Sequence, residues 1–449
     1  MMLDLVRKDS FRHGVHPPEH KDETCHLAIR RFPFAPVLIV PLSQHLGAPA
    51  IPVVREGQEV TRGQTIAEPD GFVSVAMHAP ASGVIKKFTL APNINGSMVP
   101  SVYLQPHPAS SQEVDDGEPC DIETATADEV ITAIQRAGVV GLGGAAFPTH
   151  VKLKAPEGKR LDTLIINGVE CEPYLTTDHR VMLEQTADIY LGIRYLLRAT
   201  GAKEAIIAIE ANKRDAAQKL QQHIPEDLPV TIRVCPVKYP QGAEKLVIKS
   251  LLDVEIPSGG LPADVHTICV NVATTAEIGR LLPHGRGIQE RVITIGGPGV
   301  QRKGNYRIPI GTTVRFALEE TGVANNVSRV FLGGPMMGAA VSNLDIPITK
   351  GTSGITAFTT HETGEATGHH KIYPCIHCAR CVESCPLFLN PSQLGLLAKN
   401  EEYTEMAGQF HLMDCFECGA CSYVCPSHIP LVQYFRLAKK MVRKLSEAT

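Results

Sequence analysis

The middle of the chain alternates between helical and strand-like patterns of apolar residues. Residues 120–137 carry apolar side chains at helical spacing, at Val130, Ile131, Ile134 and Ala137. Short apolar runs typical of buried strands follow, and helical stretches such as 242–252 separate them. The strand-like runs fall within 161–174, 205–210, 230–237 and 266–272. This alternation predicts a mostly parallel α/β sheet whose loops gather at one edge.

The region before this sheet has a different pattern. Between residues 50 and 90, Val or Ile and Gly recur at three-residue intervals, which predicts short strands joined by glycine turns. The pattern resembles the barrel-sandwich fold of lipoyl and biotinyl domains, which carry their cofactor on a hairpin lysine. The stretch 73–79 contains no lysine, and His78 is the nearest candidate. We therefore expect a structural or docking role for this region, without lipoylation.

The C-terminal region is predicted to be helical. Residues 390–410 predict a helix that Asn390 can cap, with Pro391 at the first helical position. Residues 429–449 predict another helix, whose basic last turn we interpret as a solvated helix end. The stretch 351–371 is rich in Gly, Thr and His and is predicted to be a linker.

Length and composition narrow the class of protein. The chain has 449 residues, 43% hydrophobic and 20% charged, as in a globular protein of several domains. A net charge of −4 gives no indication of nucleic-acid binding. The apolar run 36–42 is far shorter than the roughly 18–20 residues that span a bilayer, and the N-terminus lacks the apolar segment of a secretory signal. We expect a cytoplasmic chain with no transmembrane segment, which reaches any membrane only through partner subunits.

Eight of the 13 cysteines crowd into residues 375–425, in two runs of the form C-x2-C-x2-C-x3-C-P. Four thiolates at this spacing bind a [4Fe–4S] cube, and in two-cluster ferredoxins the fourth cysteine of each run serves the other cube. Zinc, which prefers one pair of C-x2-C elements per site, suits a doubled run less well. We assign to one cube Cys375, Cys378, Cys381 and Cys425, and to the other Cys415, Cys418, Cys421 and Cys385.

The glycine-rich stretch 138–150 raises a separate question. It contains Gly141-x-Gly143-x-x-Ala146, the letter pattern of a dinucleotide-binding turn. Such a turn should follow a strand and open a helix, whereas here a helix precedes it and Phe147-Pro148 interrupts soon after. The pattern therefore does not predict a Rossmann turn, and an ordinary glycine-rich loop stays open as an alternative.

The flanking residues carry a more specific resemblance. The stretches GLGGAAFPTHVK (141–152) and NGVECEP (167–173) resemble the FMN- and NADH-binding subunit of respiratory complex I. Tyr239-x-x-Gly242-x-Glu244 and Val270-Asn271-Val272-x-Thr274 resemble its later flavin-site segments. From GVHPPEHKDET (14–24) to the double cysteine run, the chain is similar to the C subunit of the Rnf complex, a membrane-bound, ion-translocating ferredoxin:NAD oxidoreductase. Residues 288–340 resemble the β-grasp module that accompanies the flavin domain in this family.

The resemblance implies three groups of cofactor-binding residues. One group would bring backbone amides and positive charge to the flavin: Gly141, Gly143, Gly144 and Lys152. A second group would hydrogen-bond the flavin or complete its pocket: Asn167, Glu170, Tyr239, Gly242 and Asn271. A third group would face NAD(H), where carboxylates suit ribose hydroxyls: Phe147, Glu172 and Glu244. Each of these residues could instead serve the fold alone.

Four positions depart from the complex I pattern. Val169 stands where that pattern has an acid, and Ala243 replaces one of two successive glutamates. Val270 replaces the first of two asparagines, and Leu261 falls where an aromatic residue would stack on adenine. These changes concern individual flavin hydrogen bonds and the strength of NADH binding, while the location of the site is unaffected.

The predicted architecture is a multidomain α/β protein with five parts. They are a barrel-sandwich domain (1–118), an α/β FMN- and NADH-binding domain (119–285), a β-grasp module (286–350), a linker (351–371) and a helical ferredoxin domain with two [4Fe–4S] clusters (372–449).

From the resemblance we expect a peripheral subunit on the cytoplasmic face of a bacterial inner membrane. It would exchange a hydride with NAD(H) at FMN and single electrons through the two cubes. Its implied partners are the membrane and cytoplasmic subunits of the Rnf complex and, indirectly, ferredoxin. Two alternatives stay open: a flavin and iron–sulfur cobalamin reductase of a bacterial microcompartment, and a non-catalytic electron relay or scaffold. The 14–24 block favours the Rnf-type protein over the cobalamin reductase.

Overall fold

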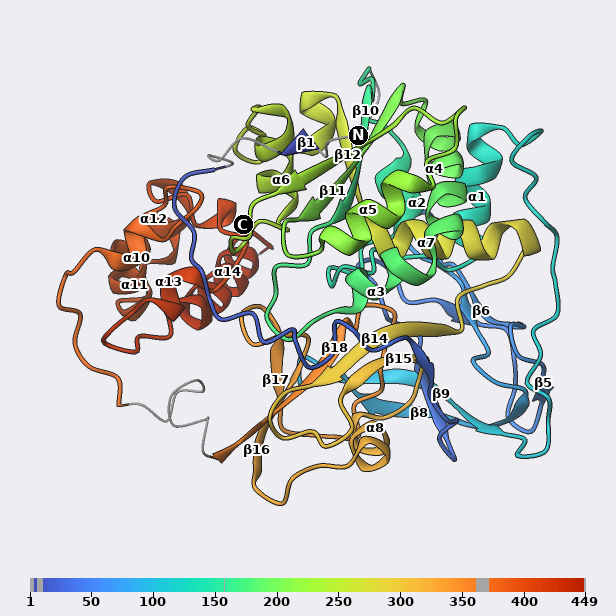
Figure 1. Ribbon diagram of the computed structural model, residues 1–449. Helices are drawn as coiled ribbons and strands as arrows, with labels where there is room; N and C mark the ends of the chain where they lie inside the picture. Colours follow the sequence, from blue (N-terminus) through green and yellow to red (C-terminus); the bar gives the residue numbers. More distant parts are fainter. Residues whose placement is uncertain (1–3, 6–10, 157, 361–370, 448–449) are drawn as a thin grey trace.

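A computed structural model describes residues 4–5, 11–156, 158–360 and 371–447 (Figure 1). Its centre is a five-stranded sheet in the order β1-β12-β11-β10-β13, and every pairing in it is parallel. These strands are β1 (Asp4–Leu5), β10 (Thr163–Gly168), β11 (Glu204–Glu210), β12 (Val230–Cys235) and β13 (Thr267–Asn271). The four strands expected after the first helix and their parallel arrangement are confirmed.

Helices cover both faces of this sheet. They are α1 (Ala127–Arg136), α2 (Thr149–Leu153), α3 (Thr177–Glu184), α4 (Thr186–Thr200), α5 (Arg214–Gln222), α6 (Glu244–Leu252) and α7 (Val272–Leu281), with the short 3-10 turns η1 (Pro262–Val265) and η2 (Leu282–His284). Successive strand residues point to opposite faces, so Ile165 packs with α6 while Leu164 and Ile166 join the larger core of α1, α4, α5 and α7. Helix α1, expected from 120–137, begins at a capping box formed by Thr126 and Glu129.

Helices α4 and α7 pack backbone to backbone. A Cβ added at Gly192 would lie 1.9 Å from the carbonyl oxygen of Thr275, and one added at Gly279 would lie 1.9 Å from that of Asp188. Glycine is therefore required at both positions, since no side chain fits between the two helices. This contact fixes the position of α7, whose N-cap residue is Asn271.

The second large sheet has six strands in the order β17-β16-β18-β14-β15-β2 and one helix packed on it. Its elements are β2 (Arg30–Arg31), β14 (Glu290–Gly296), β15 (Gly304–Pro309), α8 (Val314–Thr321), β16 (Val327–Leu332), β17 (Ala339–Val341) and β18 (Gly354–Thr359). The assignment of this module as a β-grasp stays a prediction.

Strand β18 corrects the predicted linker 351–371. All six of its residues are buried, and it pairs with both β14 and β16 inside the sheet. Threonine and glycine at 354–359 read as linker composition, but threonine is also a good strand residue once neighbouring strands supply the hydrogen bonds. The rest of that predicted linker, 361–370, lies outside the described residues.

Two small sheets form the barrel-sandwich region, which lies on the side of the molecule away from the C-terminal helices (Figure 1). One has the order β3-β9-β8-β5 and the other β4-β6-β7. The strands are β3 (Leu38–Pro41), β4 (Ile51–Pro52), β5 (Glu59–Val60), β6 (Thr65–Glu68), β7 (Met77–His78), β8 (Gly83–Pro92) and β9 (Met98–Pro106). The short strands expected between residues 50 and 90 are present. However, β1 and β2 pair with strands of the other two sheets, and the predicted bounds 1–118 stay a prediction.

The C-terminal region is a small helical unit beside the central domain (Figure 1). It contains α10 (Arg380–Glu383), α11 (Pro391–Lys399), α12 (Tyr403–Gly408), η3 (Leu412–Asp414), α13 (Ala420–Tyr423) and α14 (Leu431–Glu447). Asn390 caps α11 and Pro391 is its first residue, as expected. The stretch 390–410 forms two helices, because α11 ends at Lys399 and a turn separates it from α12.

A segment near the N-terminus ties this helical unit to the central domain. Residues 11–24, here called the N-terminal strap, run between the two (Figure 1). Gly14 donates its amide to the carbonyl of Ser384 at 3.1 Å, and Val15 exchanges two backbone hydrogen bonds with Tyr239. Within the part of the chain that the structure describes, no helix combines the length and hydropathy needed to cross a bilayer.

Candidate functional site

The carboxyl edge of the central sheet gathers several of the predicted cofactor residues. From β10 the chain continues to β11 and β12 on one side and then returns to β13 on the other side. Parallel α/β sheets bind ligands at such a change of direction, outside the carboxyl ends of the strands. Asn167 and Asn271 are register partners there, at the ends of β10 and β13.

The glycine-rich loop lies beside the end of β13. The amide of Leu142 donates to Thr274 Oγ1 at 2.8 Å, and its carbonyl accepts from Arg291 Nη2 at 2.5 Å. A Cβ added at Gly143 would lie 3.4 Å from the Asn271 side chain. Gly144 has a φ of +111° and open space around it. The loop is thus held on its inner side and open on its outer side.

Gly141 and Phe147 close this loop at its base. The Gly141 amide donates to the Phe147 carbonyl at 2.8 Å, and the Ala146 amide donates back to the Gly141 carbonyl at 3.1 Å. Between them Gly143, Gly144 and Ala145 are exposed, and their amides donate to no other group of the described chain. Exposed backbone donors of this kind suit a phosphate or a flavin edge.

Asn271 serves the helix that follows it. Its Oδ1 accepts from the amides of Ala273 and Thr274 at 3.0 and 3.2 Å, which caps α7. Its Nδ2 donates to Asp178 Oδ2 at 2.7 Å. Burial and the nearby Glu170 carboxylate raise the pKa of Asp178 to about 7. Asp178 therefore joins the site, although no sequence pattern singled it out.

Asn167 and Gly242 join the end of β10 to the loop that follows β12. Asn167 Nδ2 donates to the Gly242 carbonyl at 2.9 Å, and its Oδ1 accepts from the Val169 amide at 3.1 Å. A Cβ at Gly242 would lie 2.7 Å from the Val169 carbonyl oxygen, so only glycine allows this approach. The Gly242 amide meets the Cys171 thiol at 3.3 Å.

Lys152 and Glu244 form an ion pair at 2.5 Å, between α2 and the first turn of α6. Their side chains are 30% and 34% exposed. Such a partly exposed pair contributes at most about 1 kcal/mol. A ligand that offers phosphate to one partner and hydroxyls to the other can therefore displace it at small cost.

The two other predicted acids, Glu170 and Glu172, accept hydrogen bonds from the chain itself. Glu170 is 7% exposed and accepts from the amides of Asp178 and His179, at the start of α3. Glu172 Oε1 accepts from the amides of Met336 and Met337 at 2.6 and 3.0 Å, and burial raises its pKa. Spacing alone cannot show that the loop after β16 folds over Glu172.

Tyr239, predicted to complete the flavin pocket, lies buried between the central domain and the C-terminal unit. It is 1% exposed, and its hydroxyl donates to the carbonyl of Cys418 at 2.6 Å. It packs in a small apolar cluster with Val15 and Ala420. The helical C-terminal unit folds back onto the loop after β12 and covers this side chain, which a local sequence pattern does not reveal.

Buried cations beneath the site were missed by the sequence analysis. Lys213 Nζ pairs with Glu210 at 2.6 Å and approaches the Glu170 carbonyl at 3.4 Å. Lys21 of the strap donates to the Glu172 carbonyl at 2.9 Å. The 14–24 block contains Lys21 and was the one available signal, since Arg291 and Lys213 lie in ordinary strand and helix patterns.

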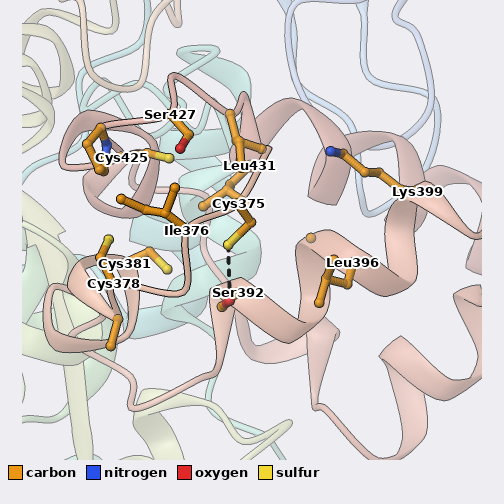
Figure 2. Close-up of a pocket in the computed structure, with 14 residues that line it drawn as sticks. Cys375, Ile376, Cys378, Cys381, Ser392, Leu396, Lys399, Cys425, Ser427 and Leu431 are labelled. Atoms are coloured by element: carbon orange, nitrogen blue, oxygen red, sulfur yellow. Dashed lines mark hydrogen bonds between the residues drawn. The ribbon is translucent and has the colours of Figure 1, made fainter. Parts of the chain in front are cut away.

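One set of four cysteines lines a cavity in the C-terminal unit (Figure 2). We call it the outer set: Cys375, Cys378, Cys381 and Cys425. It combines three cysteines of the first run with the last cysteine of the second run, in the predicted grouping. Within the described residues, no three His, Cys, Asp or Glu side chains converge on a single metal ion. Four thiols that line one cavity fit a [4Fe–4S] cube, which takes one cysteine at each iron.

The remaining four cysteines form the inner set: Cys385, Cys415, Cys418 and Cys421. Burial raises the pKa of the last three, and the nearby Cys385 thiol adds to each shift. Cys385 of the first run is therefore close to the second run, as the exchanged ligand pattern requires.

The inner set faces the central domain. Cys418 accepts the Tyr239 hydroxyl, and the carboxylate of Asp414 accepts from the Ser258 hydroxyl at 2.5 Å and the Gly259 amide at 3.3 Å. Gly419 touches the loop after β16, where an added Cβ would lie 2.7 Å from the Met336 carbonyl oxygen. The outer set, in contrast, includes the exposed thiol of Cys378.

Three family models match the chain. The RnfC barrel sandwich hybrid domain matches residues 9–108, the Nuo51 FMN-binding domain 134–280 and the 4Fe-4S dicluster domain 374–429. The predicted barrel sandwich, flavin domain and ferredoxin domain are thereby confirmed. A parallel α/β FMN-binding domain joined to a dicluster unit defines a flavin and iron–sulfur electron-transfer protein.

Full-length relatives narrow this class. The C subunit of a proton-translocating ferredoxin:NAD(+) oxidoreductase complex from Clostridium ljungdahlii is 39% identical over 98% of this chain and 95% of the relative. The Na(+)-translocating counterpart of Acetobacterium woodii is 37% identical over 86% of each chain. The C subunit of an ion-translocating oxidoreductase complex from Rhodobacter capsulatus is 40% identical over 98% of this chain and 83% of its own. The chain belongs to this family, the C subunits of Rnf-type complexes.

A solved structure shares the fold alone. A chain of an NAD+-reducing [NiFe]-hydrogenase in the H2-reduced state matches 71% of this chain and 63% of its own. The TM-score is 0.50 and the sequence identity 20%. Much of this fold thus also occurs in that protein.

Proposed function

We propose that this chain passes electrons between NAD(H), a bound FMN and two [4Fe–4S] clusters. It does so as a peripheral subunit of a membrane-bound, ion-translocating complex. The contact between Tyr239 and Cys418 carries the proposal, because it joins the loops of the flavin domain directly to the inner cysteine set. When bound, FMN supplies the conversion between two-electron and one-electron chemistry.

The chain's own residues hold and orient the two nucleotides. Exposed amides of the Gly143–Ala145 segment and the Lys152 ammonium would bind the flavin phosphate, while Asn167 and Asn271 fix the loops that follow the two strands. Phe147 and Glu244 would bind the nicotinamide nucleotide. Glu170 and Glu172 act indirectly, because their carboxylates accept hydrogen bonds from backbone amides and so fix the loops around the site.

The two cysteine sets form a route that leads away from the flavin domain. The inner set adjoins Tyr239, and the outer set ends at the exposed Cys378. The inner set would hold the cluster nearer the flavin domain, and the outer set would hold the cluster nearer a partner protein, so that together they would supply one-electron carriers between the two. Since the relatives are named as subunits of ferredoxin:NAD(+) oxidoreductase complexes, the partners are the other Rnf subunits and, through them, ferredoxin, at the cytoplasmic face.

Anaerobic reconstitution tests this proposal. The full chain is loaded with iron, sulfide and FMN, and NADH is then added while optical and EPR spectra are followed. The expected result is one FMN and eight iron atoms per chain, with bleaching of the flavin and then EPR signals of reduced clusters. A reconstituted protein without bound flavin and without NADH oxidation would contradict the enzymatic function. Cluster signals without any response to NADH would instead favour the electron relay.

A further inference from the structure

The C-terminal unit is an internal repeat in which each residue of the first half matches the residue 40 positions later. Cys375 matches Cys415, and the match continues through the cysteine runs to the helices that follow them. The backbone repeats as well. Positive φ values occur in the matched pairs His377 and Glu417, Ala379 and Gly419, and Phe388 and His428. Differences between matched side chains are therefore differences between the two cluster environments.

One such difference lies at the start of the helix after each run. Ser392, in the first turn of α11, places its hydroxyl 3.9 Å from the Cys375 sulfur (Figure 2). Its counterpart in α14 is Val432, which is 4% exposed and packs in the apolar cluster around Cys415. The outer set thus has a hydroxyl donor to a thiolate where the inner set has only methyl groups.

Two neighbouring positions also make the outer set more polar and more accessible to water than the inner set. Gly395 lines the outer cavity, whereas its counterpart Phe435 is 1% exposed and fills the corresponding space in the inner half. Cys378 is exposed, while its counterpart Cys418 is partly covered by the contact with Tyr239. The outer set is consequently the more hydrated of the two.

A reduced cube carries one more negative charge than an oxidised cube. Hydrogen bonds to the ligand sulfurs and access of water stabilise that extra charge, and both raise the reduction potential. The matched lysines lie in different surroundings. Lys439 is 9% exposed and pairs with Glu417 at 3.0 Å, whereas Lys399 is exposed and lines the outer cavity. Because the Glu417 carboxylate offsets the charge of Lys439, the hydroxyl of Ser392 and the hydration of the outer set remain the differences that favour the outer cluster.

On the basis of the proposed function, we infer that Ser392 is a positioning residue that raises the potential of the outer cluster above that of the inner cluster. One electron then leaves the inner cluster, which is oxidised, and enters the outer cluster, which is reduced, without any bond being made or broken. The repeat thereby favours transfer away from the flavin domain toward the exposed Cys378.

EPR-monitored redox potentiometry of the reconstituted full chain tests this inference. We expect two reduction steps in the wild type. Ser392→Ala should move the higher of them to lower potential and leave the other unchanged. Val432→Thr, which keeps the shape of valine and adds a hydroxyl beside Cys415, should move the lower step to higher potential. Iron content and helical circular dichroism establish that each variant is folded and loaded.

Ser427→Ala is the matched control. Ser427 lines the same cavity, but its hydroxyl donates to the Pro374 carbonyl at 2.9 Å instead of a thiolate. Its removal should shift neither step. The inference is overturned if loaded Ser392→Ala shows unchanged potentials, or if the step that moves is the lower one in the wild type. Absence of both clusters from the wild type would overturn the proposed function itself, and the two failures are therefore distinguishable.

Discussion

At the scale of single residues, Gly144 gives the most direct test of the flavin loop. Its φ of +111° is unfavourable for any residue with a Cβ, although the space around it is open. Gly144→Ala should therefore move the backbone of the loop and weaken FMN binding about tenfold or more, which corresponds to about 1.4 kcal/mol. Quenching of flavin fluorescence on binding measures the change.

Gly201→Ala is the control for this variant. Gly201 ends α4 with a φ of +68°, also in open space, but lies far along the chain from the loop. It should cost a similar amount of folding stability, about 1 kcal/mol, and leave the FMN affinity unchanged. Equal loss of FMN affinity in both variants would mean that Gly144 affects only stability.

Lys350 predicts a pH dependence of stability. It is fully buried, donates to the carbonyls of Ala76 and Gly138, and burial lowers its pKa to about 7. The unfolded chain has an ordinary lysine pKa of about 10.4, so between pH 7 and about 10 it binds more protons than the folded chain. The contribution of Lys350 to stability therefore rises with pH across this window.

Lys350→Met should remove that contribution. The difference in unfolding free energy, wild type minus variant, should grow by at most about 1.4 kcal/mol per pH unit from pH 7 upward. Urea unfolding at pH 7, 8 and 9 measures it. Lys86→Met, at an exposed position of β8, is the control and should give a difference that does not vary with pH. A constant difference for Lys350→Met as well would refute the buried-lysine argument.

The surroundings of a residue could be predicted from the sequence only where its role depends on neighbouring residues in the chain. The cysteines and glycines act through spacing and backbone freedom, both of which are local, and four of the cysteines line one cavity in the predicted grouping. Glu172 and Tyr239 depend on segments more than 150 residues away in sequence, at Met336 and Cys418. A local pattern identifies such a residue but cannot reveal which surface covers it.

At the scale of elements, we expect that straining the N-terminal strap weakens the contact between the C-terminal helical unit and the central domain. Gly14 has a φ of +83°, and a Cβ there would lie 2.7 Å from the Tyr239 carbonyl oxygen. Gly14→Ala should strain this crossing by roughly 1–3 kcal/mol and loosen the helical unit. In stopped-flow experiments with NADH, flavin reduction should keep its rate while cluster reduction slows.

Gly57→Ala provides the comparison for the strap. Gly57 has a similar φ of +78° but nothing within 4 Å of an added Cβ, and it lies in the barrel-sandwich region. It should leave both rates as in the wild type. If Gly14→Ala also leaves cluster reduction unchanged, the strap does not hold the inner set against the flavin domain.

Elements were predictable where their own residues supply the signal. The strands of the central sheet have continuous apolar runs, and α11 begins at a visible cap and proline. Strand β18 is rich in threonine and glycine, and its pairing with β14 and β16 supplies what its sequence lacks. The strands β1 and β2 contain only two residues each and are defined entirely by their partners.

At the scale of the whole molecule, the spatial order of the flavin site and the two cysteine sets leads to a prediction about electron transfer. The carboxyl edge of the central sheet, the inner cysteine set and the outer cysteine set follow one another, and Cys418 of the inner set accepts a hydrogen bond from Tyr239. If electrons follow this order, the two sets are not interchangeable. Cys418→Ala, which removes an inner ligand, should leave flavin reduction by NADH intact but prevent reduction of the outer cluster. Cys378→Ala, which removes an outer ligand, should allow NADH to reduce the inner cluster and prevent transfer to an external one-electron acceptor.

Freeze-quench EPR after NADH addition, with iron content measured for each variant, separates these outcomes. Rapid reduction of the outer cluster in loaded Cys418→Ala would show that electrons bypass the inner set, and the proposed order would then be wrong.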